Sequence, residues 1–366
     1  MNGVRSSGEV GPRFRSGIIV GKFLPPHAGH HHLIEVAQAA CAQLTIVLFG
    51  KAAEPIPIEA RRSWLAHEHP GVRVVAAVDE HPVDYGDDAT WAHWVDATLA
   101  LYRTGDDGGG ARYGIASGPD VVFSSEPYGA ELARRLGAAC VTVDVDRSRH
   151  PVSGTLVRAD PLAAWEHLRP RVRAHFVRRV AVIGAESTGK TTLCRALAET
   201  FATVWVPEHG RAYSEERGLD GPWRADELLA IATTQNAWED AGALAANRVL
   251  ICDTDALATT VWQEKYIPGS STAAVAALIR PIDLYLVSAP DVPWVDDGLR
   301  DGEDDRVWMH ERFVASVRQR AARHVVLTGS WATRQDRAVQ AIEELLREPW
   351  SGASYEPQER GTVRRA

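Results

Sequence analysis

The sequence of 366 residues is poor in cysteine and has no long apolar run. Its four cysteines lie far apart and form no Cys-x-x-Cys pair, which excludes the usual spacing of a structural zinc site or a redox dithiol. They are Cys41, Cys140, Cys194 and Cys252. No stretch reaches the roughly 18 apolar residues of a membrane span, and residues 1–16 lack the apolar run of a secretory signal. We therefore expect a cytoplasmic protein without a membrane partner.

Positive charge is also in deficit. The formal net charge of −8 argues against a general binder of nucleic acid or membrane surfaces, because such polyanions attract basic proteins. Small anionic ligands need only local positive charge and are not excluded. Of the 40 basic residues only Lys22, Lys51, Lys190 and Lys265 are lysine. Lys22 and Lys190 fall inside the motifs described below, where a compact ammonium group interacts with phosphate as a point charge.

The length and the hydrophobic pattern predict two domains. Domains commonly span roughly 100–200 residues, and apolar and charged fractions of 45% and 24% are ordinary for a globular protein. Short apolar strands alternate with helical patterns, and the alternation restarts at residue 179, which predicts an α/β fold with one parallel sheet in each domain. We expect a disordered tail at 1–16, a first domain at 17–160, a connecting helix or linker at 161–178, a second domain at 179–348 and a disordered tail at 349–366.

The expected elements follow this alternation. In the first domain we expect strands at 17–23, 44–49, 72–78 and 121–123 and helices at 31–42, 59–68 and 91–101, with a flexible loop at 106–110. In the second domain we expect strands at 179–184, 249–252, 284–287 and 325–327 and a helix at 190–200.

Residues 184–191 read Gly-Ala-Glu-Ser-Thr-Gly-Lys-Thr and match the phosphate-binding pattern G-x-x-x-x-G-K-[ST]. The motif lies between an expected strand and an expected helix, and a simple glycine-rich turn is the alternative. Backbone N–H groups would hold phosphate oxygens, Lys190 would reach the β- and γ-phosphates, and Thr191 would bind Mg²⁺. We predict an ATP site formed by Gly184, Glu186, Ser187, Thr188, Gly189, Lys190, Thr191 and Thr192.

Acidic residues follow the expected strand at 249–252. Asp253 or Asp255 is placed to organise Mg²⁺ or to accept the proton of an attacking hydroxyl. We favour Asp253, at the end of the strand, and a turn aspartate is the alternative. Glu208 and Arg211 are candidates to hold a polar substrate, and a surface ion pair explains them equally well.

Residues 294–300, Trp-Val-Asp-Asp-Gly-Leu-Arg, precede a charged stretch that contains Arg306 and Arg312. This composition predicts a mobile lid that supplies arginines, including Arg300, to the transferring phosphoryl group. A solvated charged loop is the alternative.

A second set of motifs lies in the first domain. Residues 21–30 read Gly-Lys-Phe-Leu-Pro-Pro-His-Ala-Gly-His and place His27 and His30 where a strand changes to a helix, a position that attracts a triphosphate. Zinc is the alternative because His31 and His32 are adjacent, but no cysteine or acidic residue stands nearby at zinc spacing.

Residues 152–158 read Val-Ser-Gly-Thr-Leu-Val-Arg. The hydroxyls of Ser153 and Thr155 and the guanidinium of Arg158 suit the β- and γ-phosphates of the same ATP. Ser153 as a plain helix N-cap is the alternative.

Together, His-x-Gly-His and Ser-x-Thr-x-x-Arg resemble the HxGH nucleotidyltransferase superfamily, whose domain is Rossmann-like. Their order with Phe-Ser-Ser-Glu-Pro at 123–127, the phosphate-binding loop, Asp-Thr-Asp at 253–255 and the segment 294–300 resembles the bifunctional NadR family, over about residues 17–345. The resemblance implies that the second domain phosphorylates nicotinamide riboside to nicotinamide mononucleotide (NMN) with ATP. It implies that the first domain converts NMN and ATP to NAD and pyrophosphate.

The resemblance also implies roles for single residues. In the first domain, Lys22, His27, His30 and Arg158 with Mg²⁺ would stabilise the leaving pyrophosphate, Gly21, Phe23, Ser153 and Thr155 would bind ATP, and Trp91 or Trp94 would stack on nicotinamide. In the second domain, Lys190 and Asp253 would be catalytic, Arg300 would bind ATP, and the riboside would contact Glu208, Arg211, Asp255, Trp294 and Asp296. Core packing is the alternative for Trp91 and Trp94.

Three further expectations concern partners and rivals. Some members of the family carry an N-terminal helix-turn-helix domain, and about 16 residues before the first strand are too few for one, so we expect no nucleic-acid partner. The rival enzyme is an HxGH transferase for FMN or phosphopantetheine fused to another small-molecule kinase. A nucleotide-sensing regulator without turnover is the rival from another class, and the sequence leaves a homo-oligomer open.

Overall fold

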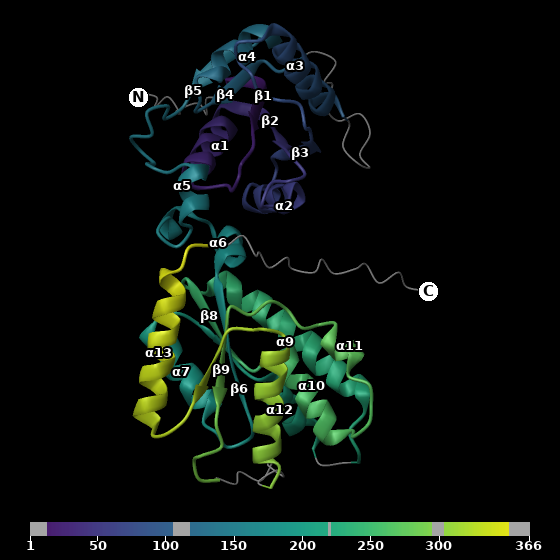
Figure 1. Cartoon of the computed structure of the whole chain (residues 1–366). Coiled ribbons are helices and arrows are strands. Elements are labelled where there is room, and N and C mark those ends of the chain that lie inside the picture. The colour runs from purple at the N-terminus through teal and green to yellow at the C-terminus, as the bar shows by residue number, and fades with distance from the viewer. Residues whose placement is uncertain (1–12, 105–117, 219–220, 295–303, 351–366) are drawn as a thin grey trace, which may run out of the picture. The chain divides into compact units, whose positions relative to one another are not determined.

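The computed structural model describes residues 13–104, 118–218, 221–294 and 304–350. The chain divides into two compact units, Met1–Val172 and Arg173–Ala366 (Figure 1). The point of division lies in the segment predicted to connect two domains, within helix α6 (Pro170–Phe176). No helix in the described ranges combines the length and the apolar character needed to cross a bilayer.

The first unit contains a five-stranded parallel sheet with strand order β3-β2-β1-β4-β5. Its strands are β1 (Phe14–Gly21), β2 (Cys41–Gly50), β3 (Arg73–Val78), β4 (Val121–Ser124) and β5 (Ala139–Thr142). Its helices are α1 (Ala28–Ala40), α2 (Ile58–Glu68), α3 (Asp88–Arg103), α4 (Tyr128–Leu136) and α5 (Gly154–Ala159), followed by a 3-10 turn η1 (Trp165–His167).

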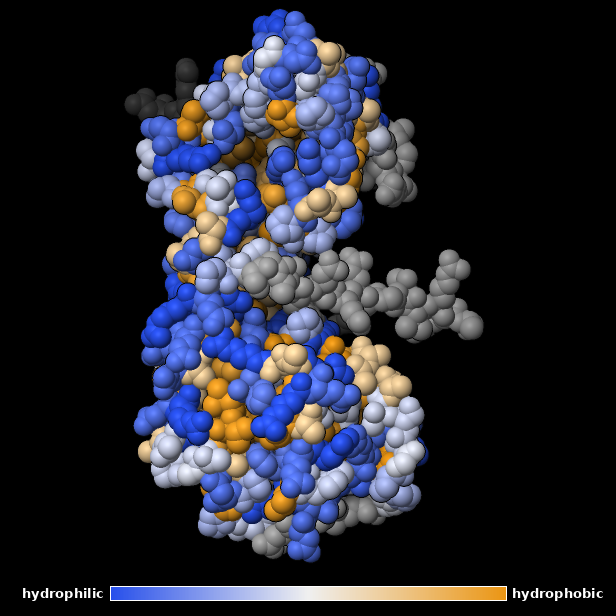
Figure 2. Space-filling view, viewed as in Figure 1, coloured by the Kyte–Doolittle hydropathy of each residue, from blue (hydrophilic) through white to orange (hydrophobic). Residues whose placement is uncertain are grey.

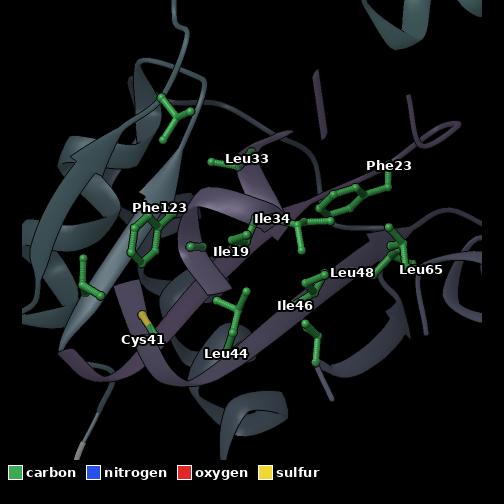
Figure 3. Packing of buried hydrophobic residues seen from close by; sticks show 14 residues of the cluster. Ile19, Phe23, Leu33, Ile34, Cys41, Leu44, Ile46, Leu48, Leu65 and Phe123 are labelled. Atoms are coloured by element: carbon green, nitrogen blue, oxygen red, sulfur yellow. The ribbon is translucent and has the colours of Figure 1, made fainter. Parts of the chain in front are cut away.

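Alternating side chains of the first sheet supply two apolar layers, because successive residues of a strand face opposite sides. Ile19 and Ile46 pack with Ile34 of α1 and Leu65 of α2, as Figure 3 shows. The other face, which includes Ile18, packs against α3 and α4. Helices on both faces are what a parallel sheet requires, since its strands cannot leave one face in water.

The second unit contains another five-stranded parallel sheet, with strand order β10-β9-β6-β8-β7. Its strands are β6 (Arg178–Gly184), β7 (Trp205–Val206), β8 (Val249–Asp253), β9 (Leu284–Ser288) and β10 (His324–Leu327). Its helices are α7 (Lys190–Thr200), α8 (His209–Arg217), α9 (Ala225–Ala245), α10 (Ala256–Tyr266), α11 (Ala273–Ala276), α12 (Arg306–Gln319) and α13 (Trp331–Arg347).

Helices α7 and α13 cover one face of the second sheet, where Leu197 and Ile342 pack on Val180 and Leu286. On the molecular surface drawn in Figure 2, hydrophobic residues occupy only limited areas, since most of them are packed inside. Because β6 lies between β8 and β9, the strand order reverses at the carboxyl end of β6. Ligands bind at such switch points in open α/β sheets.

The structure differs from the expected elements at several boundaries. The helix expected at 31–42 begins at Ala28 and ends at Ala40, because Ala28–His30 form its first turn and Cys41 starts β2. The edge strands β5 and β7 were not expected, since β5 is largely exposed and lacks a buried apolar run, and β7 has only two residues. The loop expected at 106–110 lies outside the described residues.

Candidate functional sites

A pocket of about 580 Å³ opens in the first unit at the carboxyl ends of β1 and β4. All ten residues proposed for the first domain line it, although they come from three separate segments of the chain, 21–30, 91–94 and 153–158. They are Gly21, Lys22, Phe23, His27, His30, Trp91, Trp94, Ser153, Thr155 and Arg158. The tertiary structure therefore unites the two motifs at the switch point of this sheet.

His27 and His30 lie side by side at the start of α1, with ring centroids 3.8 Å apart. His27 is the N-cap residue, but its side chain makes no capping hydrogen bond. Burial, followed by the charge of Arg147, lowers the pKa of His27 to about 3, and burial also lowers the pKa of His30 far below its usual value. Both Nδ1 atoms lack a hydrogen-bond partner among the described residues, so two neutral imidazoles are available to a ligand.

Gly29 leaves room for the imidazole of His27, because a Cβ atom on residue 29 would lie only 3.3 Å from Cε1 of His27. The described residues contain no group of three or more histidine, cysteine or acidic side chains arranged for a metal.

The second motif packs directly against the first. Arg158 donates hydrogen bonds to the carbonyl oxygen of Leu24 and, at 3.3 Å, to Thr155 Oγ1. A Cβ atom on Gly154 would lie 2.6 Å from the Leu24 oxygen, so only glycine allows α5 to start here. Ser153 Oγ accepts a hydrogen bond from the Leu156 N–H at 3.2 Å, which makes Ser153 the N-cap of α5. The capping alternative is therefore realised, and the same hydroxyl lines the pocket.

Lys22 belongs to a charged network that the sequence did not reveal. Its Nζ donates to Glu54 Oε1 at 3.0 Å, and Arg61 Nη2 donates to Glu54 Oε2 at 2.8 Å. Arg61 is completely buried and also donates to the carbonyl oxygen of Lys22 at 2.7 Å. Burial opposes ionisation of Glu54, but the hydrogen bond from Lys22 and the charge of Arg61 hold its pKa below the usual value.

Trp91 and Trp94 both line the pocket, but they differ in their surroundings. Trp91 is buried, and its Nε1 donates to the carbonyl oxygen of Tyr85 at 3.1 Å. Trp94 is half-buried and packs edge-on against Phe49, with ring centroids 4.8 Å apart. Core packing, the alternative for both, describes Trp91 better.

Tyr85 and Arg147 are lining residues that sequence reasoning missed. Tyr85 is 59% exposed and stacks on Tyr128 with an interplanar angle of 7°. Arg147 donates to Glu126 Oε1 at 2.8 Å and lies close enough to His27 to lower its pKa. Neither residue belongs to a motif, so only the fold brings them to the pocket.

The phosphate-binding loop of the second unit connects β6 to α7, as its sequence predicts. Gly184 and Gly189 have φ values of +152° and +82°, which L-residues rarely adopt. Lys190 is buried, and its Nζ donates to the carbonyl oxygen of Ala185 at 3.0 Å. Thr188 Oγ1 donates to the same oxygen at 2.8 Å, so the side chains of Lys190 and Thr188 are both bound to the backbone of the loop.

Thr191 and Asp253 meet at the carboxyl ends of neighbouring strands. Thr191 Oγ1 donates to Asp253 Oδ2 at 2.5 Å, and Asp253 is 1% exposed. Burial raises the pKa of Asp253 although Lys190 and the Thr191 hydrogen bond oppose it. Its Oδ1 has no hydrogen-bond partner in the described part of the chain, and hard oxygen ligands of this kind fit Mg²⁺.

A pocket of about 630 Å³ extends from this loop. Its lining includes Glu208, Arg211 and an aromatic cluster of Trp223, Trp262 and Tyr266. Tyr266 stacks on Trp223 and on Trp262, with centroids 5.0 and 5.7 Å apart. Burial raises the pKa of Glu208 to about 7, although the charge of Lys190 opposes this. The sequence did not single out these three aromatic residues.

Asp255 was expected to contact substrate, but the structure puts it elsewhere. It is buried outside the pocket lining and caps α10. Its Oδ1 accepts from the Ala258 N–H at 3.0 Å and its Oδ2 accepts from the Tyr285 hydroxyl at 2.7 Å. Both oxygens are therefore engaged inside the protein, and the expectation of a substrate contact is corrected to a capping role.

The other expected contacts are met in part. Arg211 lines the pocket while its Nε donates to Glu215 Oε1 at 3.0 Å, so the surface ion pair also exists.

Trp294 is not among the pocket-lining residues and packs under the guanidinium of Arg306, 5.7 Å from its ring centroid. Arg306 donates to the carbonyl oxygen of Ser187 at 3.3 Å, which ties the start of α12 to the loop. Arg312 pairs instead with a glutamate on α10, Glu264, at 2.7 Å. Asp296 and Arg300 lie outside the described residues.

The fold and the two pockets define the class: a Rossmann-like unit with HxGH nucleotidyltransferase motifs followed by a P-loop kinase-type unit, both built on parallel sheets. A family model described as "AAA domain" matches residues 179–334. The chain is also 29% identical over 357 residues to the trifunctional NAD biosynthesis/regulator protein NadR of Salmonella typhimurium and to that of Escherichia coli K12. Each match covers 91% of this chain and 83% of the relative.

Solved structures agree with this match. A NadR protein in complex with NR superimposes with a TM-score of 0.75 at 25% identity, over 90% of this chain and 95% of that one. A NadR protein in complex with NAD and AMP-PNP gives 0.74 at 24% identity, over 91% and 96%. The chain is a homologue of the NadR proteins.

Proposed function

We propose that this chain is a bifunctional NAD salvage enzyme. The observation that carries the proposal is that each unit gathers its own set of nucleotide motifs into its own pocket. The relatives named for NAD biosynthesis and the solved structures with NR and with NAD and an ATP analogue support the same substrates. ATP is the co-substrate of both steps, and the cytoplasmic location expected from the sequence belongs to the same proposal.

In the second unit, the hydroxyl of nicotinamide riboside attacks the γ-phosphorus of ATP and ADP leaves. Asp253 lies beside the phosphate-binding loop, where it can accept the proton of the attacking hydroxyl. Lys190 neutralises charge on the phosphates. Thr191 and Asp253 would hold Mg²⁺, which supplies further charge neutralisation. The aromatic wall of Trp223, Trp262 and Tyr266 suits a flat pyridine ring.

In the first unit, the phosphate of NMN attacks the α-phosphorus of ATP and pyrophosphate leaves. The nucleophile is already an anion, so the step needs positioning and charge neutralisation and no general base. Neutral His27 and His30 can donate hydrogen bonds to phosphate oxygens, and Lys22 and Arg158 supply positive charge at the same pocket.

The direct test is incubation with nicotinamide riboside, ATP and Mg²⁺, followed by chromatography for NMN and NAD. Appearance of both products supports the proposal. If the first unit adenylates FMN or phosphopantetheine but not NMN, the proposed acceptor is wrong. If ATP binds but neither unit turns it over, the chain is a nucleotide-sensing regulator.

The two steps are separable by substitution. Lys190→Ala removes the ammonium of the phosphate-binding loop and should abolish NMN formation from nicotinamide riboside, while NAD formation from NMN continues. Loss of both activities would contradict two independent sites.

A further inference from the structure

Lys265 is one of the four lysines of the chain, and no motif accounts for it. It lies in the last turn of α10, and its side chain is only 8% exposed. The ammonium group faces the rings of Trp262 and Tyr266, 5.5 and 5.2 Å from their centroids. Lysine is almost never buried unless its charge is paired, so the charges around Lys265 indicate its role.

Two carboxylates lie near this ammonium group. Glu186 Oε2, in the phosphate-binding loop, is 3.9 Å from Lys265 Nζ, and Asp305 Oδ2, in the N-cap residue of α12, is 3.8 Å away. Both distances are too long for a hydrogen bond, so Lys265 acts on these two carboxylates through its charge. The side chain of Asp305 is 50% exposed to water, whereas that of Glu186 is 15% exposed. Water therefore screens the interaction with Glu186 less than the interaction with Asp305.

The position of Glu186 makes its charge important for the loop. Glu186 lines the pocket of the second unit together with Glu208 and Asp253. Burial is the main cause of the raised pKa of Glu208, and the charges of Asp253 and Glu186 add to it. The negative charge of Glu186 therefore acts inside the pocket. ATP is a polyanion, so an unbalanced carboxylate in the loop would repel the phosphates that the loop has to hold.

We propose that Lys265 is a positioning residue of the second unit, which balances the charge of Glu186 so that the phosphate-binding loop accepts ATP. This inference rests on the proposed function and adds a residue that no phosphate-binding motif specifies. The next residue of the loop, Ser187, is held as well, because Arg306 donates to its carbonyl oxygen at 3.3 Å. Consecutive residues of the loop thus interact with a lysine of α10 and an arginine of α12.

The kinetic test is a double-mutant cycle in the full chain. Lys265→Met keeps the length of the side chain but removes its charge, and we expect it to raise the KM for ATP in NMN formation on the order of tenfold. In a Glu186→Gln background the same substitution should change this KM by less than about twofold, because no carboxylate is left to balance. Any other role of Glu186 is common to both members of that comparison. Lys265→Arg keeps the charge and should stay close to wild type.

Glu264→Gln is the matched control. Glu264 precedes Lys265 on α10 and accepts a hydrogen bond from Arg312 of α12 at 2.7 Å. The substitution therefore breaks an ion pair between the same two helices and leaves Lys265 and Glu186 in place, so the KM for ATP should stay within about twofold of wild type. In Lys265→Met, an unchanged kcat at saturating ATP and unchanged NAD formation from NMN show that both units fold.

Three results would overturn the charge-balancing role. One is a KM for ATP that Lys265→Met leaves unchanged. Another is an equal rise with and without Glu186→Gln, because Lys265 would then support the loop by packing alone. The third is a rise in the KM for nicotinamide riboside but not for ATP, because Lys265 would then act through Trp262 and Tyr266.

A binding measurement does not depend on turnover. His30→Ala should disable the ATP site of the first unit, so that calorimetric titration with Mg²⁺ and AMP-PNP reports the second unit, and Lys190→Ala in this background should remove the remaining heat. Adding Lys265→Met instead should raise the dissociation constant on the order of tenfold, and Glu186→Gln should cancel the increase. An unchanged dissociation constant contradicts the role of Lys265. Absence of NMN formation in wild type contradicts the kinase and leaves this readout valid.

Discussion

Thr191 Oγ1 and Asp253 Oδ2 are 2.5 Å apart although 62 positions separate them in the chain. The contact exists because β6 and β8 are parallel neighbours, so Asp253 at the carboxyl end of β8 lies beside the start of α7, which follows β6. The nearby Asp255 faces the core and caps α10. The two aspartates therefore have different expected phenotypes.

Asp253→Asn should lower kcat of the kinase step by at least about 100-fold, because it removes a base and a metal ligand while keeping the size of the side chain. NAD formation from NMN should continue. The matched control, Asp255→Asn, should lower the melting temperature more than it lowers kcat, because it weakens a buried cap and the bond to Tyr285. A kinase that survives Asp253→Asn but not Asp255→Asn would reverse the assignment.

Glu54→Gln should destabilise the first unit, because it removes the only anion that is hydrogen-bonded to buried Arg61 in the described ranges. Breaking a buried ion pair costs about 3–5 kcal/mol, measurable by denaturant unfolding. Lys22 also loses its partner, so the KM for ATP in NAD formation should change while the kinase step does not. Glu59→Gln, on the exposed pair with Arg62, is the matched control and should cost below about 1 kcal/mol. Equal costs for the two variants would refute the buried role.

Adenylyl transfer should show no inflection from His27 between pH 5 and 8. Burial lowers the pKa of His27 to about 3, so the imidazole stays neutral over this range. The measurement is kcat/KM for NMN and ATP against pH, which reports the free enzyme. An inflection near pH 6.5 that disappears in His27→Asn would show that the imidazole titrates as if exposed.

Stability should fall as pH rises from about 4.5 to 8 through Glu239. Burial, followed by the charge of Asp255, raises the pKa of Glu239 to about 8, although the charge of Arg179, 3.9 Å away, opposes this, while the unfolded chain ionises near its usual value. Between these two values the folded state binds more protons than the unfolded state, so the free energy of unfolding decreases with rising pH.

Glu239→Gln lacks this titration, so the difference in unfolding free energy between it and wild type should shift by a few kcal/mol across that window, on the order expected from the pKa change. Thermal unfolding of both proteins at several pH values measures the shift. A difference that stays constant with pH would mean that Glu239 is ionised throughout.

The local features of this protein follow from short stretches of its amino-acid sequence. The phosphate-binding loop, the strand before it and the helix that starts at Lys190 follow from glycine spacing and apolar period over about 20 residues. The parallel α/β class follows in the same way, because alternating strands and helices leave few other arrangements. Neighbours in the chain decide such features.

The contacts between residues that are far apart in the chain follow instead from the three-dimensional fold. Arg158 donates to the carbonyl oxygen of Leu24, 134 positions away in the chain. Glu54 accepts hydrogen bonds from both Lys22 and the buried Arg61. Asp255 accepts the hydrogen bond of Tyr285 from a position 30 residues away in the chain. No local period specifies such contacts, because they arise when parallel strands are ordered in a sheet and helices cover its two faces.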